Sequence, residues 1–167
     1  MDISPTTEAD LTALDKLYAT AFPDEPLAPL VRALLGEAEP PLSLAARADG
    51  ALIGHVMFSP ARVGEAHRAA MLAPLGVLPE WQRRGVGSAL VRAGLAEVWA
   101  DGVTTVLVLG DPAYYGRFGF VPERGVRPPY PMPAQWADAW QSLVTGEAPV
   151  GPISLSPTWM QPSLWGS

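Results

Sequence analysis

The stretch between residues 75 and 88 constrains the fold more than any other part of this chain of 167 residues. It runs Leu-Gly-Val-Leu-Pro-Glu-Trp-Gln-Arg-Arg-Gly-Val-Gly-Ser, so an apolar strand end is followed by a turn and by two glycines that open an amphipathic helix. The first turn of a helix leaves backbone N–H groups without partners, and glycine lets a ligand approach that backbone closely. Arg83 and Arg84 add two positive charges beside it. The sequence therefore predicts a cradle for a phosphate or pyrophosphate group.

This cradle matches neither of the two common nucleotide-binding patterns. No Gly-Lys-Ser or Gly-Lys-Thr follows the turn, so the stretch is not a P-loop. Leu90 stands where the dinucleotide pattern Gly-x-Gly-x-x-Gly requires its third glycine. The sequence therefore disfavours a protein that binds ATP or NAD through this turn.

Hydrophobic periodicity on both sides of this stretch predicts an α/β fold, with helices layered on a mixed sheet. A capping box, Thr7-Glu8-Ala9-Asp10, opens the first helix. We expect helices at 11–22, 27–35 and 85–100, and a short one that starts at Pro112 and ends before Gly119. We expect strands at 42–48, 52–59, 68–78 and 104–109, and two more near 136–141 and 153–155, although Trp136 and Trp140 also match helical spacing. Pro74 predicts a bulge or a splayed edge within its strand, because proline donates no ladder hydrogen bond.

Composition excludes several classes of function. The chain has no cysteine and two histidines, His55 and His67, so we expect no metal site. Its net charge is −6 and it contains a single lysine, so we expect no nucleic-acid partner. No apolar run approaches the roughly 18 residues that a membrane span requires, and the first residues resemble no signal peptide. We expect one domain over residues 1–167 in a soluble, cytoplasmic protein.

Charge is unevenly distributed along the chain. Residues 1–50 hold nine acids and three bases, a balance of 3 − 9 = −6. Residues 62–127 hold eight arginines and six acids, a balance of 8 − 6 = +2. An anionic ligand is therefore expected to bind in the middle of the chain, where the predicted cradle lies.

Two segments resemble the GCN5-related N-acetyltransferases, the GNAT superfamily. Gln82-Arg83-Arg84-Gly85-Val86-Gly87 resembles the acyl-CoA-binding motif Gln/Arg-x-x-Gly-x-Gly/Ala of that family, and Val77-Leu78-Pro79-Glu80 is similar to its lead-in. The segment 111–120, Asp-Pro-Ala-Tyr-Tyr-Gly-Arg-Phe-Gly-Phe, resembles the later segment in which a tyrosine precedes Gly-Phe by four residues. The residues of this segment are similar to those of the YhbS-type branch of predicted acetyltransferases. The order of the expected helices and strands resembles that of the family over residues 1–125, and the motifs themselves match over 70–120. Residues 128–167 form a Pro- and Trp-rich C-terminal part of the same domain.

The resemblance implies a fold and an activity. The fold would be a mixed, mostly antiparallel central sheet, splayed at the cofactor strand and flanked by helices. The activity would be N-acetyl transfer from acetyl-CoA, without a metal, to a primary amine that attacks directly in a ternary complex. The alternative is a module on the same fold that binds acyl-CoA without turnover, as a sensor or an interaction partner.

The resemblance also implies roles for individual residues. Backbone groups of Leu75, Gly76 and Val77 would pair with the pantetheine arm, and the Val77 N–H would stabilise the oxyanion. Tyr115 would be the general acid that protonates the departing thiolate, while Tyr114 lies one residue out of register. The pyrophosphate would be held by the motif residues, which are Gln82, Arg83, Arg84, Gly85, Val86, Gly87 and Ser88.

The general base and the acceptor stay open at this point. Many relatives carry a glutamate on the strand before the tyrosine, but residues 104–109 hold no acid, and the chain has no asparagine. Asp111, Glu65 and His55 are candidate bases, and a water relay competes with all three. Asp111 could instead cap a helix, and His55 could be a hydrogen-bonded sheet residue. The acceptor could be a small-molecule or peptide amine drawn by the acidic first 50 residues, and the Trp-rich tail could cover it, pack as core or form a homodimer contact.

Overall fold

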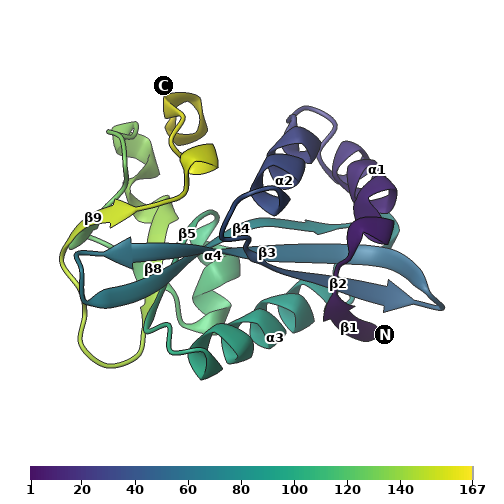
Figure 1. Ribbon diagram of the computed structural model, residues 1–167, viewed down its shortest axis with the longest axis horizontal. Helices are drawn as coiled ribbons and strands as arrows, with labels where there is room; N and C mark the ends of the chain where they lie inside the picture. Colours follow the sequence, from purple (N-terminus) through teal and green to yellow (C-terminus); the bar gives the residue numbers. More distant parts are fainter. Residues whose placement is uncertain (167) are drawn as a thin grey trace. The chain divides into compact units, whose positions relative to one another are not determined.

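The computed structural model describes residues 1–166, whose strands form one mixed sheet flanked by helices (Figure 1). Hydrogen-bonded neighbours in the sheet follow the order β1-β2-β3-β4-β5-β8-β6, and β9 pairs with both β3 and β7. The strands are β1 (Asp2–Pro5), β2 (Leu42–Ala48), β3 (Ala51–Val63), β4 (His67–Val77), β5 (Thr105–Leu109), β6 (Val121–Pro122), β7 (Val126–Arg127), β8 (Trp140–Val144) and β9 (Gly151–Ser154). The α-helices are α1 (Leu11–Ala21), α2 (Leu27–Leu35), α3 (Val86–Ala100) and α4 (Pro112–Tyr115). The predicted α/β class with a mixed sheet is confirmed.

The chain folds into two compact units. The first comprises Met1–Phe58 and Ala73–Glu97, and the second comprises Ser59–Leu72 and the chain from Val98 onward. Strands β3 and β4 and helix α3 each contribute residues to both units. The single domain inferred from the sequence stays a prediction.

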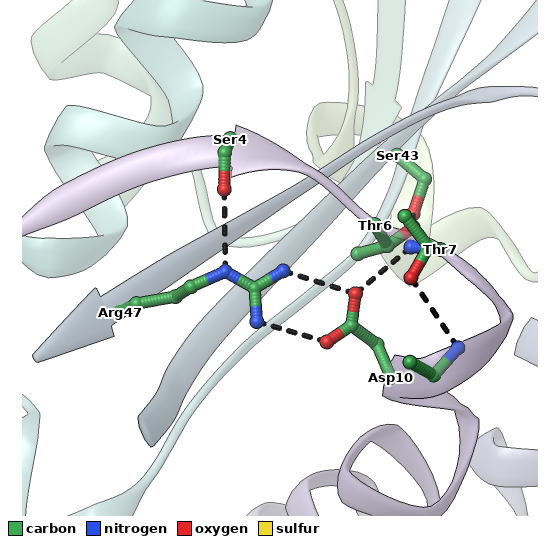
Figure 2. Close-up of polar contacts among 7 residues, drawn as sticks. Ser4, Thr6, Thr7, Asp10, Ser43 and Arg47 are labelled. Carbon is green, nitrogen blue, oxygen red and sulfur yellow. Dashed lines mark hydrogen bonds and ion pairs between the residues drawn. The ribbon is translucent and has the colours of Figure 1, made fainter. Parts of the chain in front are cut away.

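In the first unit, polar contacts tie the N-terminal strand to the start of α1 (Figure 2). The predicted capping box is present: Thr7 N–H donates to Asp10 Oδ2 at 2.8 Å, and Ala9 N–H donates to Thr7 Oγ1 at 3.3 Å. Arg47 on β2 donates to both carboxylate oxygens of Asp10, at 2.8 and 2.9 Å. Its Nε also donates to Ser4 on β1 at 3.2 Å. These contacts hold β1, α1 and β2 together at one corner of the unit.

Helix α3 buries the face that the sequence predicts. Val86, Leu90 and Val91 are each 3% exposed or less. Apolar residues at this spacing place one stripe of the helix against the sheet, and that burial drives the packing. The helix therefore fixes where its own first turn lies, which is the turn that follows the predicted cradle.

The proline in β4 does not interrupt the strand. The strand runs from His67 to Val77 through Pro74, whose peptide bond with Ala73 is cis. Its parallel ladder with β5 joins Ala69–Met71 to Thr105–Leu107, and β4 then continues beyond this ladder. The ladder with β5 thus ends before Pro74, as expected for a splayed edge, while the strand itself continues to Val77.

The second unit contains the C-terminal tail, in which Trp140, Trp159 and Trp165 pack as core. Trp140 and Trp159 each meet Trp165 edge-on, with ring centroids 5.6 and 6.4 Å apart. The Trp159 indole N–H donates to Ser59 Oγ at 3.0 Å. The tail was expected to cover the acceptor, to pack as core or to form a homodimer contact, and these three tryptophans pack as core.

Two expectations for the C-terminal part of the chain need correction, and one N-terminal strand was not expected. The strand predicted at 136–141 begins only at Trp140, because Ala134–Ala139 form a 3₁₀ helix, and Trp136 and Trp140 form no α-helical pair. The strand predicted at 153–155 is Gly151–Ser154. β1 was not expected, because Asp2–Pro5 is too short to show a pattern and gains its hydrogen bonds only from β2. Among residues 1–166 no helix is both long and apolar enough to cross a membrane.

Candidate functional site

The turn between β4 and α3 has an unusual backbone. A 3₁₀ helix, Pro79–Trp81, follows β4, and the chain then turns through Arg83 and Gly85, with φ values of 62° and 83°. A left-handed conformation is uncommon for arginine and natural for glycine. The Gln82 side chain donates from Nε2 to the Val77 carbonyl at 3.1 Å. This hydrogen bond ties the turn back to the end of β4.

The first turn of α3 presents backbone donors beside that turn. The Ala89 N–H donates to the Gly85 carbonyl at 3.0 Å, which closes the first hydrogen bond of the helix. The N–H groups of Val86, Gly87 and Ser88 come before this bond, so the helix itself offers them no acceptor. The macrodipole adds about half a positive charge at the same end. A Cβ placed on Gly85 would find no heavy atom within 4 Å, so the space before the helix is open.

Two arginines add full charges to this open turn. Arg83 and Arg84 are both exposed, and the Arg84 guanidinium carbon lies 5.2 Å from the centroid of the Trp81 ring. Stacking on an aromatic face restricts a guanidinium and leaves its N–H groups free to bind oxygen atoms. The turn thus combines helix N–H groups, a glycine and two guanidinium groups, a donor set that fits a pyrophosphate.

The predicted pantetheine strand lies directly before the turn. Gly76 is buried, and Leu75 and Val77 are half-buried. The Leu78 N–H donates to the Ile53 carbonyl at 2.9 Å, which fixes the end of β4 against β3. All residues predicted to hold the cofactor, from 75 to 88, therefore lie in the first unit.

His55 is buried, and both of its ring nitrogens have partners. Its Nδ1 lies 2.7 Å from Tyr18 Oη, and its Nε2 lies 2.7 Å from Ser43 Oγ. Ser43 Oγ in turn lies 2.6 Å from Thr6 Oγ1. Burial lowers the pKa of His55 to about 3, although the charge of Asp10 opposes the shift. The ring is therefore neutral at pH 7 and acts as a link in a buried hydrogen-bond chain.

In the second unit, Tyr115 lies at the end of α4 in an aromatic cluster. Its ring meets Tyr114 and Phe120 edge-on, at centroid distances of 5.0 and 5.8 Å. Burial raises the pKa of the Tyr115 phenol, and the neighbouring Tyr114 adds to the shift. The phenol is therefore protonated at neutral pH and can donate a proton or a hydrogen bond.

The two carboxylates proposed as bases have different surroundings. Asp111 Oδ1 accepts from the Ala113 N–H at 2.9 Å, so this side chain caps α4. Glu65 is exposed in the turn between β3 and β4. No group of three or more His, Cys, Asp or Glu side chains in the described part of the chain is arranged to hold a metal ion.

Sequence reasoning missed the partners that surround the candidate residues. It singled out His55 but neither Tyr18 nor Ser43, which lie 37 and 12 positions away. It also missed the stacking of Arg84 on Trp81, although the two residues are close in sequence. The available signal was an aromatic residue three positions before an arginine in a turn, a spacing that brings side chains together only once the turn is formed.

A match to a known family gives the class of protein. A model of the acetyltransferase (GNAT) family matches residues 11–120, so the chain belongs to that family. The resemblance found in the sequence is confirmed.

Particular relatives lie within the same family. The Escherichia coli K12 protein named uncharacterized N-acetyltransferase YjhQ is 40% identical over 148 residues, which are 83% of this chain and 82% of that protein. YhbS of the same strain, also named an uncharacterized N-acetyltransferase, is 38% identical over 113 residues, 66% of this chain and 68% of YhbS.

Two solved structures share the fold. Escherichia coli YhbS in complex with CoA matches with a TM-score of 0.86 and 28% identity, over 96% of this chain and 92% of that one. A GNAT family acetyltransferase from Brucella melitensis in complex with acetyl-CoA matches with a TM-score of 0.78 and 30% identity, over 95% and 97%. The predicted GNAT-like sheet flanked by helices is confirmed.

Proposed function

We propose that this protein is an N-acetyltransferase that moves an acetyl group from acetyl-CoA to the primary amine of a small molecule or a peptide. The observation that carries the proposal is the open turn before α3, where Arg83 and Gly85 are left-handed and a Cβ on Gly85 would meet no heavy atom within 4 Å. Family membership supports it, and so do two similar structures that contain CoA or acetyl-CoA.

The donor set in the first unit fits the polar parts of acetyl-CoA. The N–H groups of residues 86–88 would bind the pyrophosphate, together with Arg83 and Arg84. Backbone groups of Leu75, Gly76 and Val77 would pair with the pantetheine amides. The Val77 N–H would also donate to the thioester oxygen as negative charge develops on it.

Acetyl-CoA supplies an acetyl group activated as a thioester, from which CoA leaves as a thiol. Tyr115 would act on the leaving group: its Oη donates a hydrogen bond, and then its proton, to the sulfur as the C–S bond breaks. The raised pKa of Tyr115 means that the phenol carries its proton at neutral pH. Solvent then returns a proton to the phenolate.

The acceptor amine must lose a proton before or during its attack, because a lysine-like amine has a pKa near 10.4. His55 is poorly suited to accept it, because its pKa is about 3 and both of its nitrogens are hydrogen-bonded. Asp111 already caps a helix, and Glu65 is exposed. We therefore favour transfer to water, with the acidic surface of the first unit attracting the cationic amine.

The direct test is release of CoA thiol from acetyl-CoA across a panel of primary amines. We expect Tyr115→Phe to lower turnover by roughly ten- to a thousandfold while the KM for acetyl-CoA changes little. Tyr114→Phe is the companion variant, because it removes the neighbouring hydroxyl and decides between the two tyrosines. An equal loss of affinity and turnover in Tyr115→Phe would contradict the acid role.

The same assay separates the enzyme from the alternative function. Strand β5 carries no carboxylate, and its residues Thr105–Val108 are buried, which is the observation that keeps a non-catalytic acyl-CoA sensor in consideration. Binding of acetyl-CoA without thiol release from any amine in the panel would favour the sensor.

A further inference from the structure

The ring of Tyr115 lies directly against the backbone of Gly110. A Cβ placed on Gly110 would stand 2.5 Å from Tyr115 Cε2 and 3.0 Å from Cδ2, closer than nonbonded carbon atoms approach. The φ of Gly110 lies outside the left-handed region, so an alanine could adopt the same backbone conformation. A glycine is therefore required here by the tyrosine ring and not by the backbone.

The peptide of Gly110 is held in turn by the beginning of β8. The Gly110 N–H donates to the Ala139 carbonyl at 2.9 Å. Gln141 Nε2 donates to the Gly110 carbonyl at 3.0 Å and to the Ala139 carbonyl at 3.3 Å. Gln141 is 0% exposed, and its Nε2 makes both of these hydrogen bonds while its buried Oε1 has no partner. One buried side chain thus fixes the peptide on which the Tyr115 ring rests.

We propose that Gln141 and Gly110 are positioning residues for the Tyr115 hydroxyl. Gln141 fixes the Gly110 peptide, and Gly110 leaves the space that the ring occupies. Phe120, which is buried, confines the ring by an edge-on contact. Together these contacts set the direction in which Oη points. The inference rests on the proposed acid role of Tyr115, because a proton donor acts only when its hydroxyl points at the departing sulfur.

The first test is Gly110→Ala, made both in the wild type and in Tyr115→Phe. Because the added methyl displaces the ring, we expect kcat to fall about tenfold or more, with the KM for acetyl-CoA unchanged within about twofold. In the Tyr115→Phe background we expect no further fall, since the hydroxyl that Gly110 positions is gone. Gly116→Ala is the matched control: Gly116 lies in the same segment with φ −56°, and its Cβ would meet nothing within 4 Å.

A second variant tests the positioning role of Gln141. Gln141→Met has a similar volume and no donor, so it releases the Gly110 carbonyl. We expect the same loss of kcat, again absent in the Tyr115→Phe background, in protein that melts cooperatively. If Gln141→Met does not fold, Gly110→Ala decides alone.

The outcomes separate this inference from the proposed function. If Tyr115→Phe lowers kcat while Gly110→Ala leaves it unchanged, or adds its full effect to that of Tyr115→Phe, the positioning role is wrong and the acid role stands. If Tyr115→Phe itself leaves kcat unchanged, the acid role is wrong, and the positioning role is overturned with it.

Discussion

The ring of Tyr18 on α1 lies against the α-carbon of Gly76 on β4, so close that a Cβ at position 76 would stand 2.9 Å from Tyr18 Cε1. Tyr18 is 0% exposed, and its hydroxyl is 2.7 Å from His55 Nδ1, so the ring has no room to move away. The helix thereby sets the position of the strand that carries the proposed pantetheine contacts.

Gly76→Ala should therefore lower both stability and cofactor affinity. Overpacking of a buried site costs about 1–3 kcal/mol, and here the strain falls on β4 or on the buried tyrosine. We expect the free energy of unfolding in urea to fall by that amount and the dissociation constant for CoA to rise.

Gly36→Ala is the control for this substitution. Gly36 caps α2 with φ −86°, and its Cβ would make only ordinary contacts of 3.6 Å. At this position alanine mainly lowers the conformational entropy of the unfolded chain, which should change the free energy of unfolding by less than about 1 kcal/mol. Equal behaviour of the two variants would contradict the contact between Tyr18 and Gly76.

The ion pair of Asp10 and Arg47 should make a measurable part of stability depend on acid pH. The hydrogen bonds from Arg47 hold the pKa of Asp10 below its usual value of 3.8, although burial opposes the shift. A carboxyl with a depressed pKa in the folded state stabilises the fold above the unfolded value and loses that contribution as pH falls through the folded value. The pair thus stabilises fully at pH 7 and progressively less below about pH 4.

Asp10→Asn isolates this contribution, because it removes the charge and keeps a carbonyl oxygen for the Thr7 N–H. The Asp10 and Arg47 side chains are 12% and 22% exposed, so the pair is partly buried, and we expect a loss of about 1.5–3 kcal/mol at pH 7, the range for hydrogen bonds to charged groups. The difference from wild type should shrink toward pH 3.

Asp15→Asn provides the comparison for an exposed pair. Asp15 pairs with Arg32 where the side chains are 42% and 47% exposed, so solvent screens the pair and its loss should lower the free energy of unfolding much less. Equal losses of unfolding free energy in the two variants at pH 7 would show that the ion pair of Asp10 and Arg47 stabilises the fold no more than an exposed pair does.

The buried, neutral His55 should make the fold less stable as the pH falls below 6.5. Its folded pKa is about 3 and its ordinary value is 6.5, so below pH 6.5 the unfolded chain binds a proton that the folded chain refuses. Stability is therefore full above pH 6.5 and falls as pH decreases toward 3, by about 1.4 kcal/mol for each pH unit.

His55→Gln should flatten the dependence of unfolding free energy on pH between 6.5 and 4, even though it lowers stability at pH 7. His67→Gln, at a half-exposed position, is the matched control. Unfolding in urea across that pH range measures both slopes. An unchanged slope in His55→Gln would contradict the buried, neutral histidine.

The two arginines of the turn should dominate the affinity for CoA. Arg83→Glu with Arg84→Glu replaces two guanidinium groups by carboxylates beside the proposed pyrophosphate, so binding should weaken by about 2–5 kcal/mol. Glutamate at position 83 faces the same left-handed backbone as arginine, so the fold itself should be little affected. Calorimetric titration with CoA measures the effect.

A control of equal net charge is Arg62→Glu with Arg127→Glu, two exposed arginines outside the turn. This pair should change CoA affinity only through long-range charge, an effect that disappears as salt is raised. Equal losses in both double variants would place the phosphate site elsewhere.

The sequence predicts those elements whose signals are local. The spacing of Val86 and Leu90 predicted α3, and Thr7 with Asp10 predicted the start of the first helical segment. The turn at Asp49 and Gly50, both with positive φ, was also predictable, because glycine and aspartate favour that geometry.

What the sequence could not predict depends on contacts between distant residues. Strands β6 and β7 have only two residues each, and the tryptophans of the Pro-rich tail are placed by one another rather than by periodicity. The fit of Tyr115 against Gly110 is likewise invisible in the sequence, because a glycine does not reveal which side chain occupies the space beside it.

The central claim is that the turn before α3 binds the phosphates of CoA, and thermal unfolding with acetyl-CoA, CoA, ATP and NAD side by side tests it most directly. A ligand at about a hundred times its dissociation constant adds roughly 2.7 kcal/mol of stability, which shifts the melting temperature visibly. We predict a shift with acetyl-CoA and CoA and none with ATP or NAD. A protein that melts cooperatively and responds to neither CoA species would contradict the account.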